Sequence, residues 1–184
     1  VTDHHRPADQ LPDCPVVNPV LKDYPFPFLC GAGVAFKLVQ ALGGIDAAMD
    51  YVDIAALATV ADVVPLTGEN RVIVKLGLER INEKPRPGIR ALIESAGLSD
   101  KRIGAGNVAF QLAPRLNAGG RIGSARRSYD LLLSATAAQA RPLAEELEAE
   151  NSNRKDIEQS ILAEAEAQLE GFDFPAHRAL VLAG

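Results

Sequence analysis

Apolar side chains recur at every third or fourth position through most of the chain, which is the spacing of one face of an α-helix. The 47–59 segment is apolar almost throughout, so we expect its helix to be buried on most sides. The pattern as a whole predicts helices over residues 31–42, 47–59, 69–82, 88–96, 108–116 and 124–133, and a long helix from Ser134 or Thr136 to about Leu169.

Glycine and proline indicate where these helices stop. Gly43 and Gly44 close the first helix, and the Pro85 and Pro87 pair breaks the 69–82 helix. Residues 117–120, with the sequence Asn-Ala-Gly-Gly, predict a turn after the 108–116 helix.

Extended structure is expected near both ends of the chain. Six prolines between residues 6 and 28 forbid a continuous helix and indicate an extended excursion, with a short strand at Val16 and Val17. Val1 and Thr2 resemble the last residues of a strand, and residues 179–183 resemble the start of another. We therefore expect an α/β fold that is mostly helical in this chain, and a chain that is a piece of a longer protein.

The long helix suggests how the chain is organised. Its apolar positions face one way and its acidic residues the other, which is typical of a solvated helix that joins two domains. Five polar residues, 151–155, interrupt the apolar stripe and make a coiled coil the weaker interpretation. We expect one domain over residues 1–135, a connecting helix over 136–171 and the start of a second domain at 172–184.

Composition excludes several classes of protein. The chain has 184 residues, of which 47% are hydrophobic and 23% charged, as in an ordinary globular protein. The apolar runs are far shorter than the ~20 residues of a membrane helix, so we expect no membrane span. Cys14 and Cys30 have no Cys-x-x-Cys spacing, which argues against a disulfide framework. These features favour a cytoplasmic protein.

Charge is distributed unevenly along the chain. The net charge of −5 argues against a nucleic-acid partner, because phosphate binding depends on Lys and Arg. From Lys101 to Tyr129, however, there are six basic residues and no Asp or Glu. This stretch is therefore the candidate surface for a polyanion.

Two segments carry the residue types of a metal site. Asp3, His4 and His5 offer one carboxylate and two imidazoles, a mixture that suits manganese, zinc or iron. Asp62 stands in an apolar run at the end of a helix expected to be buried, where a carboxylate needs a cation or several donors. The alternatives are a polar strand end for the histidines and a helix cap or turn for Asp62.

Four motifs stand out along the chain, at Val1–His5, Leu29–Leu38, Ala56–Leu66 and Leu112–Arg121. In this order they resemble the DHH phosphoesterase family, a group of metal-dependent enzymes that hydrolyse phosphodiester bonds. Within the family, the pattern is most similar to the 5′ to 3′ exonucleases that act on single-stranded DNA.

The resemblance implies a site for two Mn²⁺ or Mg²⁺ ions. It assigns His4 and Asp62 as metal ligands, Asp3 as their support, and His5 as a residue facing the metal or the scissile phosphate. Asp3 and His5 are thus the candidate catalytic residues. The family also carries an Asp-x-Asp motif before this region and a further domain after the connecting helix. We therefore expect this chain alone to bind metal weakly and to hydrolyse little.

The resemblance also places the last motif at the active cleft, with Arg115, Asn117 and Arg121 as candidate nucleic-acid-binding residues. A guanidinium there can hold a DNA phosphate, such as the terminal 5′-phosphate. The alternative for either arginine is a salt bridge within the scaffold. This chain has Ala-Gly-Gly-Arg where the family more often has Ala-Ala-Gly-Arg.

These features lead to one function and two alternatives. The leading hypothesis is an exonuclease of DNA repair and recombination that acts on single-stranded DNA, with a single-strand-binding protein and a helicase as candidate partners. The first alternative is a phosphodiesterase for short oligonucleotides or cyclic dinucleotides, or a pyrophosphatase. The long helix and the last motif argue against the pyrophosphatase. The second is a catalytically dead protein that binds single-stranded DNA, against which the presence of His4 and Asp62 argues.

Overall fold

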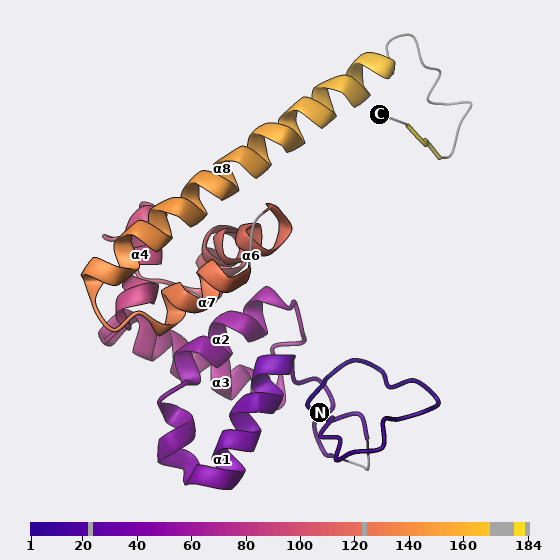
Figure 1. Cartoon of the computed structure of the whole chain (residues 1–184), viewed down its shortest axis with the longest axis vertical. Helices are drawn as coiled ribbons and strands as arrows, with labels where there is room; N and C mark the ends of the chain where they lie inside the picture. The colour runs from indigo at the N-terminus through magenta and orange to yellow at the C-terminus, as the bar shows by residue number, and fades with distance from the viewer. Residues whose placement is uncertain (22–23, 123–124, 170–178, 183–184) are drawn as a thin grey trace.

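The computed structural model describes residues 1–21, 24–122, 125–169 and 179–182, and it is mostly helical, as expected (Figure 1). Extended pairing within these residues is limited to a parallel bridge between Thr2 and Val17. The helices are α1 (Gly31–Met49), α2 (Val52–Ala61), α3 (Gly68–Glu83), α4 (Pro87–Ser95), α5 (Ala105–Asn107), a π-helical turn η1 (Val108–Leu112), α6 (Ala113–Ile122), α7 (Ala125–Leu133) and α8 (Ala137–Gln168).

Helix α2 lies between two hydrophobic clusters. Val52 and Ala56 belong to a cluster formed with α1 and α3, whereas Leu57 and Val60 belong to a larger cluster with the helices from α3 to α8. The expectation that this segment is buried on most sides is confirmed, and each of the two cores depends on one part of α2.

The helix predicted over 47–59 is wrong in its first part. Gly44 has φ 84° and ψ 175°, so the predicted stop at Gly43 and Gly44 is confirmed, but α1 resumes and continues to Met49. The chain then turns at Asp50 and Tyr51 before α2 begins. Helical periodicity did not indicate this turn, because apolar residues continue on both sides of it.

α1 is long and apolar enough, by length and composition, to cross a membrane. The non-helical backbone of Gly44 divides it, however, and the part before Gly44 is only about 20 Å long, against about 30 Å for the hydrocarbon layer. Val34 and Phe36 are buried in the α1–α3 cluster. These facts favour α1 as a core helix.

The predicted turn at residues 117–120 is also wrong, because α6 continues to Ile122. Ala118 is fully buried, and the Ser128 hydroxyl donates to the Leu116 carbonyl oxygen at 2.7 Å. These contacts with neighbouring elements offset the poor helix propensity of the glycines. The π-helical turn lies just before Pro114, whose missing N–H and ring are incompatible with a regular α-helical ladder.

The long helix begins as expected, because the Thr136 hydroxyl oxygen accepts from the backbone N–H of Gln139 at 3.3 Å. Its first half packs on the body through Ala140, Ala144, Leu147 and Asn151. Beyond Asn151 the helix extends away from the body (Figure 1), and its apolar residues such as Ile157 and Ile161 are exposed. Residues 179–182 form no strand, and most of the 172–184 segment lies outside the described residues.

A buried ion pair fixes the beginning of α2. Asp53 is fully buried, and its two carboxylate oxygens accept from Nε and Nη2 of Arg86 at 2.7 and 2.6 Å. Arg86 Nη2 also donates to the Asp50 carbonyl oxygen at 2.8 Å, and Arg80 donates to that of Met49 at 3.1 Å. Both arginines thereby hold the turn between α1 and α2.

We predict that Asp53→Ala lowers the free energy of unfolding by about 3 kcal/mol, because it leaves the Arg86 guanidinium without its carboxylate in a largely buried place. Urea denaturation followed by circular dichroism measures this. Asp156→Ala, which removes an exposed carboxylate from α8, should change stability by less than about 0.5 kcal/mol. Equal effects of the two substitutions would contradict the anchoring role of Asp53.

We predict that Gly77→Ala lowers the free energy of unfolding by about 3 kcal/mol through overpacking between α2 and α3. A Cβ at Gly77 would lie 2.5 Å from the Val52 carbonyl oxygen and closer still to Ala56 Cβ. The control is Gly106→Ala, whose Cβ meets nothing within 4 Å and should be tolerated. A thermal melt of both variants is sufficient, and an unchanged melting temperature for Gly77→Ala would refute this packing.

Candidate metal centre

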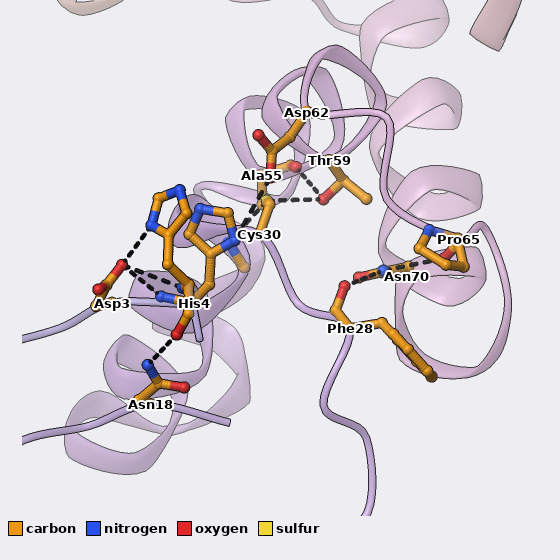
Figure 2. Close-up of polar contacts among 12 residues, drawn as sticks. Asp3, His4, Asn18, Phe28, Cys30, Ala55, Thr59, Asp62, Pro65 and Asn70 are labelled. Atoms are coloured by element: carbon orange, nitrogen blue, oxygen red, sulfur yellow. Dashed lines mark hydrogen bonds and ion pairs between the residues drawn. The ribbon is translucent and has the colours of Figure 1, made fainter. Parts of the chain in front are cut away.

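Backbone pairing positions the Asp3–His5 segment. The Asp3 N–H donates to the Val17 carbonyl oxygen at 3.1 Å, next to the Thr2–Val17 bridge. Asn18, which is 8% exposed, donates through Nδ2 to the His5 carbonyl oxygen at 2.9 Å and accepts from the Val20 N–H at 2.9 Å. Asn18 is thus both a turn residue and a tie that holds the histidine segment (Figure 2).

Asp3 organises the two histidines that follow it. Its Oδ1 accepts from the backbone N–H groups of His4 at 2.7 Å and His5 at 3.3 Å, and it lies 2.8 Å from His5 Nδ1. The hydrogen bond with the His5 ring, followed by those from the two backbone amides, lowers the pKa of Asp3 from 3.8 to about 2. Asp3 is therefore a carboxylate at neutral pH.

His4 and Asp62 face each other from opposite parts of the chain. His4 Nδ1 lies 3.5 Å from Asp62 Oδ2 (Figure 2), although the two residues are far apart in the sequence. The His4 and His5 rings lie side by side with centroids 4.2 Å apart. The structure therefore brings together the two ligands that the motifs suggested.

The expectation that Asp62 is buried is wrong. It forms the C-cap of α2, and 42% of its side chain is exposed, so desolvation does not require a cation there. Val63, which follows it, has φ 57°, a conformation that costs a β-branched residue energy. The fully buried carboxylate is instead Asp53, which the sequence analysis did not single out.

A cavity of about 350 Å³ adjoins this pair. Its polar lining comes from His4, Asp62 and Asn117, and its remaining wall is mostly apolar. Helix α2 forms one side through residues such as Ala58 and Ala61, and α6 forms another through Leu116 and Asn117. The elements that carry all four motifs thus meet at one cavity.

Cys30 joins two of these elements beside the cavity. It is 1% exposed, and its Sγ accepts from the Gly33 N–H at 3.3 Å as the N-cap of α1. The same sulfur lies 3.5 Å from Thr59 Oγ1, which donates to the Ala55 carbonyl oxygen at 2.7 Å. A Cβ at Gly33 would lie 3.3 Å from Leu29 Cδ2, so tight local packing favours a glycine at this position.

Asn70 fixes the loop that follows Asp62, and sequence reasoning missed it. It is fully buried, and its Nδ2 donates to the carbonyl oxygens of Phe28 at 2.7 Å and Pro65 at 3.0 Å (Figure 2). It therefore ties the entry to α1 to the loop after α2. A polar residue in the first turn of an amphipathic helix gave no signal of this, since such residues are usually solvated.

The three candidate nucleic-acid residues have different surroundings. The Arg115 side chain is 10% exposed, pairs with Glu148 of α8 and donates to the Gln111 carbonyl oxygen at 2.6 Å, which favours the scaffold alternative. Asn117 is exposed and lines the cavity. Arg121 lies in the last turn of α6, and its side chain lies outside the described part of the chain.

The donor set fits a divalent transition metal. One ligand atom from each of Asp3, His4 and His5 lies within 4.8 Å of the others, and the Asp62 carboxylate approaches His4 from the other side. Carboxylate oxygen and imidazole nitrogen together suit Mn²⁺ or Zn²⁺ better than Ca²⁺.

No family model matches the chain. It is 44% identical over 183 residues to the single-stranded-DNA-specific exonuclease RecJ of Salmonella typhimurium, covering 90% of this chain and 32% of that protein. It is 41% identical over 189 residues to RecJ of Thermus thermophilus, covering 99% of this chain and 27% of that protein. The chain thus spans about a third or less of these relatives.

Solved structures agree with the sequence relatives. RecJ of Thermus thermophilus in complex with Mn²⁺ superposes with a TM-score of 0.79 at 41% identity, covering 89% of this chain and 25% of that one. Exonuclease RecJ bound to manganese superposes with a TM-score of 0.75 at 38% identity, covering 90% and 43%. In sequence and in fold, the chain is therefore similar to a part of the RecJ exonucleases.

Proposed function

We propose that this chain supplies part of a metal-dependent exonuclease that hydrolyses single-stranded DNA from the 5′ end in DNA repair and recombination. The observation that carries the proposal is the approach of His4 Nδ1 to the Asp62 carboxylate at 3.5 Å, at a cavity that Asn117 also lines. Relatives named as single-stranded-DNA-specific exonucleases support the substrate.

Each residue of the centre has a distinct role in this proposal. His4 and Asp62 hold a metal ion, and Asp3 keeps its charge and orients both histidines through its hydrogen bonds. His5, whose ring is largely exposed, faces the scissile phosphate and donates a hydrogen bond to it. Bound Mn²⁺ or Mg²⁺ supplies Lewis-acid stabilisation of the phosphate and activation of water. The remaining ligands of a two-metal site come from outside this chain.

The strand is held by residues of α6. Asn117 contacts the nucleotide from the cavity wall, and Arg121, one helical turn further on, binds a phosphate. Arg115 contributes indirectly, since its ion pair with Glu148 packs α6 on α8.

The wider organisation follows the same proposal. Residues 1–135 belong to an α/β catalytic domain, whose parallel pairing begins with the Thr2–Val17 bridge. Residues 136–171 connect it to a second domain that starts at 172–184, and the exposed second half of α8 supports that role. A single-strand-binding protein and a helicase are the proposed partners, and the cytoplasm the proposed location.

We predict that the full-length protein with Mn²⁺ shortens single-stranded DNA stepwise from its 5′ end, and that His4→Ala or Asp62→Ala lowers the rate at least about 100-fold by removing a ligand. Strands labelled at the 5′ or the 3′ end, resolved on denaturing gels, distinguish the direction. Isothermal titration with Mn²⁺ should show weaker binding in both variants.

The matched control is Asp9→Asn, which removes an exposed carboxylate from the same N-terminal segment and should leave the rate unchanged. A dinucleotide and a cyclic dinucleotide are tested in parallel. Cleavage of these small substrates alone would replace the exonuclease with an oligonucleotide phosphodiesterase, and DNA binding without any hydrolysis would indicate a catalytically dead protein.

A further inference from the structure

Phe110 is an aromatic side chain that the fold does not bury. It lies in η1 and is 84% exposed. Other residues of η1 and α6 are buried. Those buried residues include Val108, Leu112, Arg115 and Ala118. Packing of this chain therefore gives no reason for a phenyl ring at position 110.

Phe110 and the cavity residue Asn117 are seven positions apart on continuous helical structure. Gly106, Phe110, Pro114 and Asn117 follow one another at intervals of four, four and three positions along α5, η1 and α6, and we call these four residues the α6 ridge. Gly106, Phe110 and Asn117 are all exposed. The ridge thus leads from Phe110 to the cavity that His4 and Asp62 share.

The spacing along the ridge suits a nucleic-acid strand. Asn117 follows Phe110 by seven positions, a rise of about 10 Å along the helix. Three stacked bases at about 3.4 Å each cover the same distance. A strand with one nucleotide at the cavity therefore brings a base to Phe110.

Charge around the ridge favours a polyanion. No Asp or Glu occurs from Lys101 to Tyr129. Lys101 and Arg102 precede the ridge, are exposed, and form no salt bridge with any residue in the described ranges. A neutral, acid-free helix face with an exposed ring and nearby free cations is the chemistry of single-strand binding.

We infer that Phe110 is a stacking platform for a base of single-stranded DNA, about three nucleotides from the nucleotide that lies beside Asn117 at the cavity. The inference rests on the proposed exonuclease function and deepens it by assigning a residue that binds bases. The ring stacks without reading sequence, because every base offers a π-face. Its contribution is to hold the strand along the α6 ridge.

The test is equilibrium binding of a fluorescent 20-nucleotide oligo(dT) to the full-length protein in EDTA, so that hydrolysis does not interfere. Phe110→Ala should raise the dissociation constant about 5- to 100-fold, while Phe110→Trp should keep it near the native value. Phe110→Leu should bind as weakly as Phe110→Ala, because leucine is apolar but cannot stack. Leu42→Ala, which removes another exposed apolar side chain, is the control and should bind normally.

An abasic oligonucleotide of the same length isolates stacking, since Phe110→Ala should make no difference to its binding. Thermal melting of each variant should match the native protein, as expected for an exposed side chain. Native binding by Phe110→Ala or by Phe110→Leu would overturn the inference while leaving the exonuclease proposal intact. A native protein that neither binds nor hydrolyses single-stranded DNA would instead overturn the proposed function itself.

Discussion

Asp53 and Arg86 form the ion pair on which the placement of helix α2 depends. A carboxylate that is fully buried is costly to desolvate, and here both of its oxygens receive donors from one guanidinium. The same arginine holds the Asp50 carbonyl oxygen, so the turn before α2 and its first residues are fixed together. Both hydrophobic clusters include residues of α2, and the fit against Gly77 of α3 leaves no space for the helix to shift.

This anchored helix carries Asp62 at its other end. Because α2 is rigid, the position of its last residue is set by contacts at its first turn, about 14 Å away. His4 approaches from a different part of the chain, held by backbone pairing and by Asn18. Asn70 and Cys30 connect the loop after α2 and the start of α1. The candidate metal centre is thus positioned by polar contacts, and those of Asn18 and Asn70 satisfy backbone carbonyl oxygens.

Some residues of helix α6 pack against the scaffold and others line the cavity, depending on the side of the helix from which they project. Arg115 faces α8 and pairs with Glu148, whereas Asn117, two positions on, faces the cavity. Pro114 precedes both residues and follows the π-helical turn in which Phe110 lies. One helix therefore packs the long helix on the body and presents an exposed face at the metal centre.

The sequence by itself determined most of the helices, because periodic burial leaves an apolar stripe that can be read directly. It also predicted that His4 and Asp62 belong together, because both lie in the ordered motifs, and the structure places them 3.5 Å apart. The sequence also predicted the interruption of α1 at Gly44 and the N-cap of α8 at Thr136, because both depend on local residues.

Only the tertiary structure decided how exposed each charged residue is and what it contacts. Asp62 was expected to be buried and is exposed, while the buried Asp53 gave no signal, because its partner lies 33 positions away. The same limit applies to Arg115, whose choice between phosphate and scaffold depends on where Glu148 lies in space. The Asn-Ala-Gly-Gly segment is helical for this reason too, since contacts with α7 and α8 outweigh its local preference for a turn. The local sequence determines helical periodicity and helix caps, whereas the burial of a charged side chain and its choice of ion-pair partner depend on residues that are distant in the sequence.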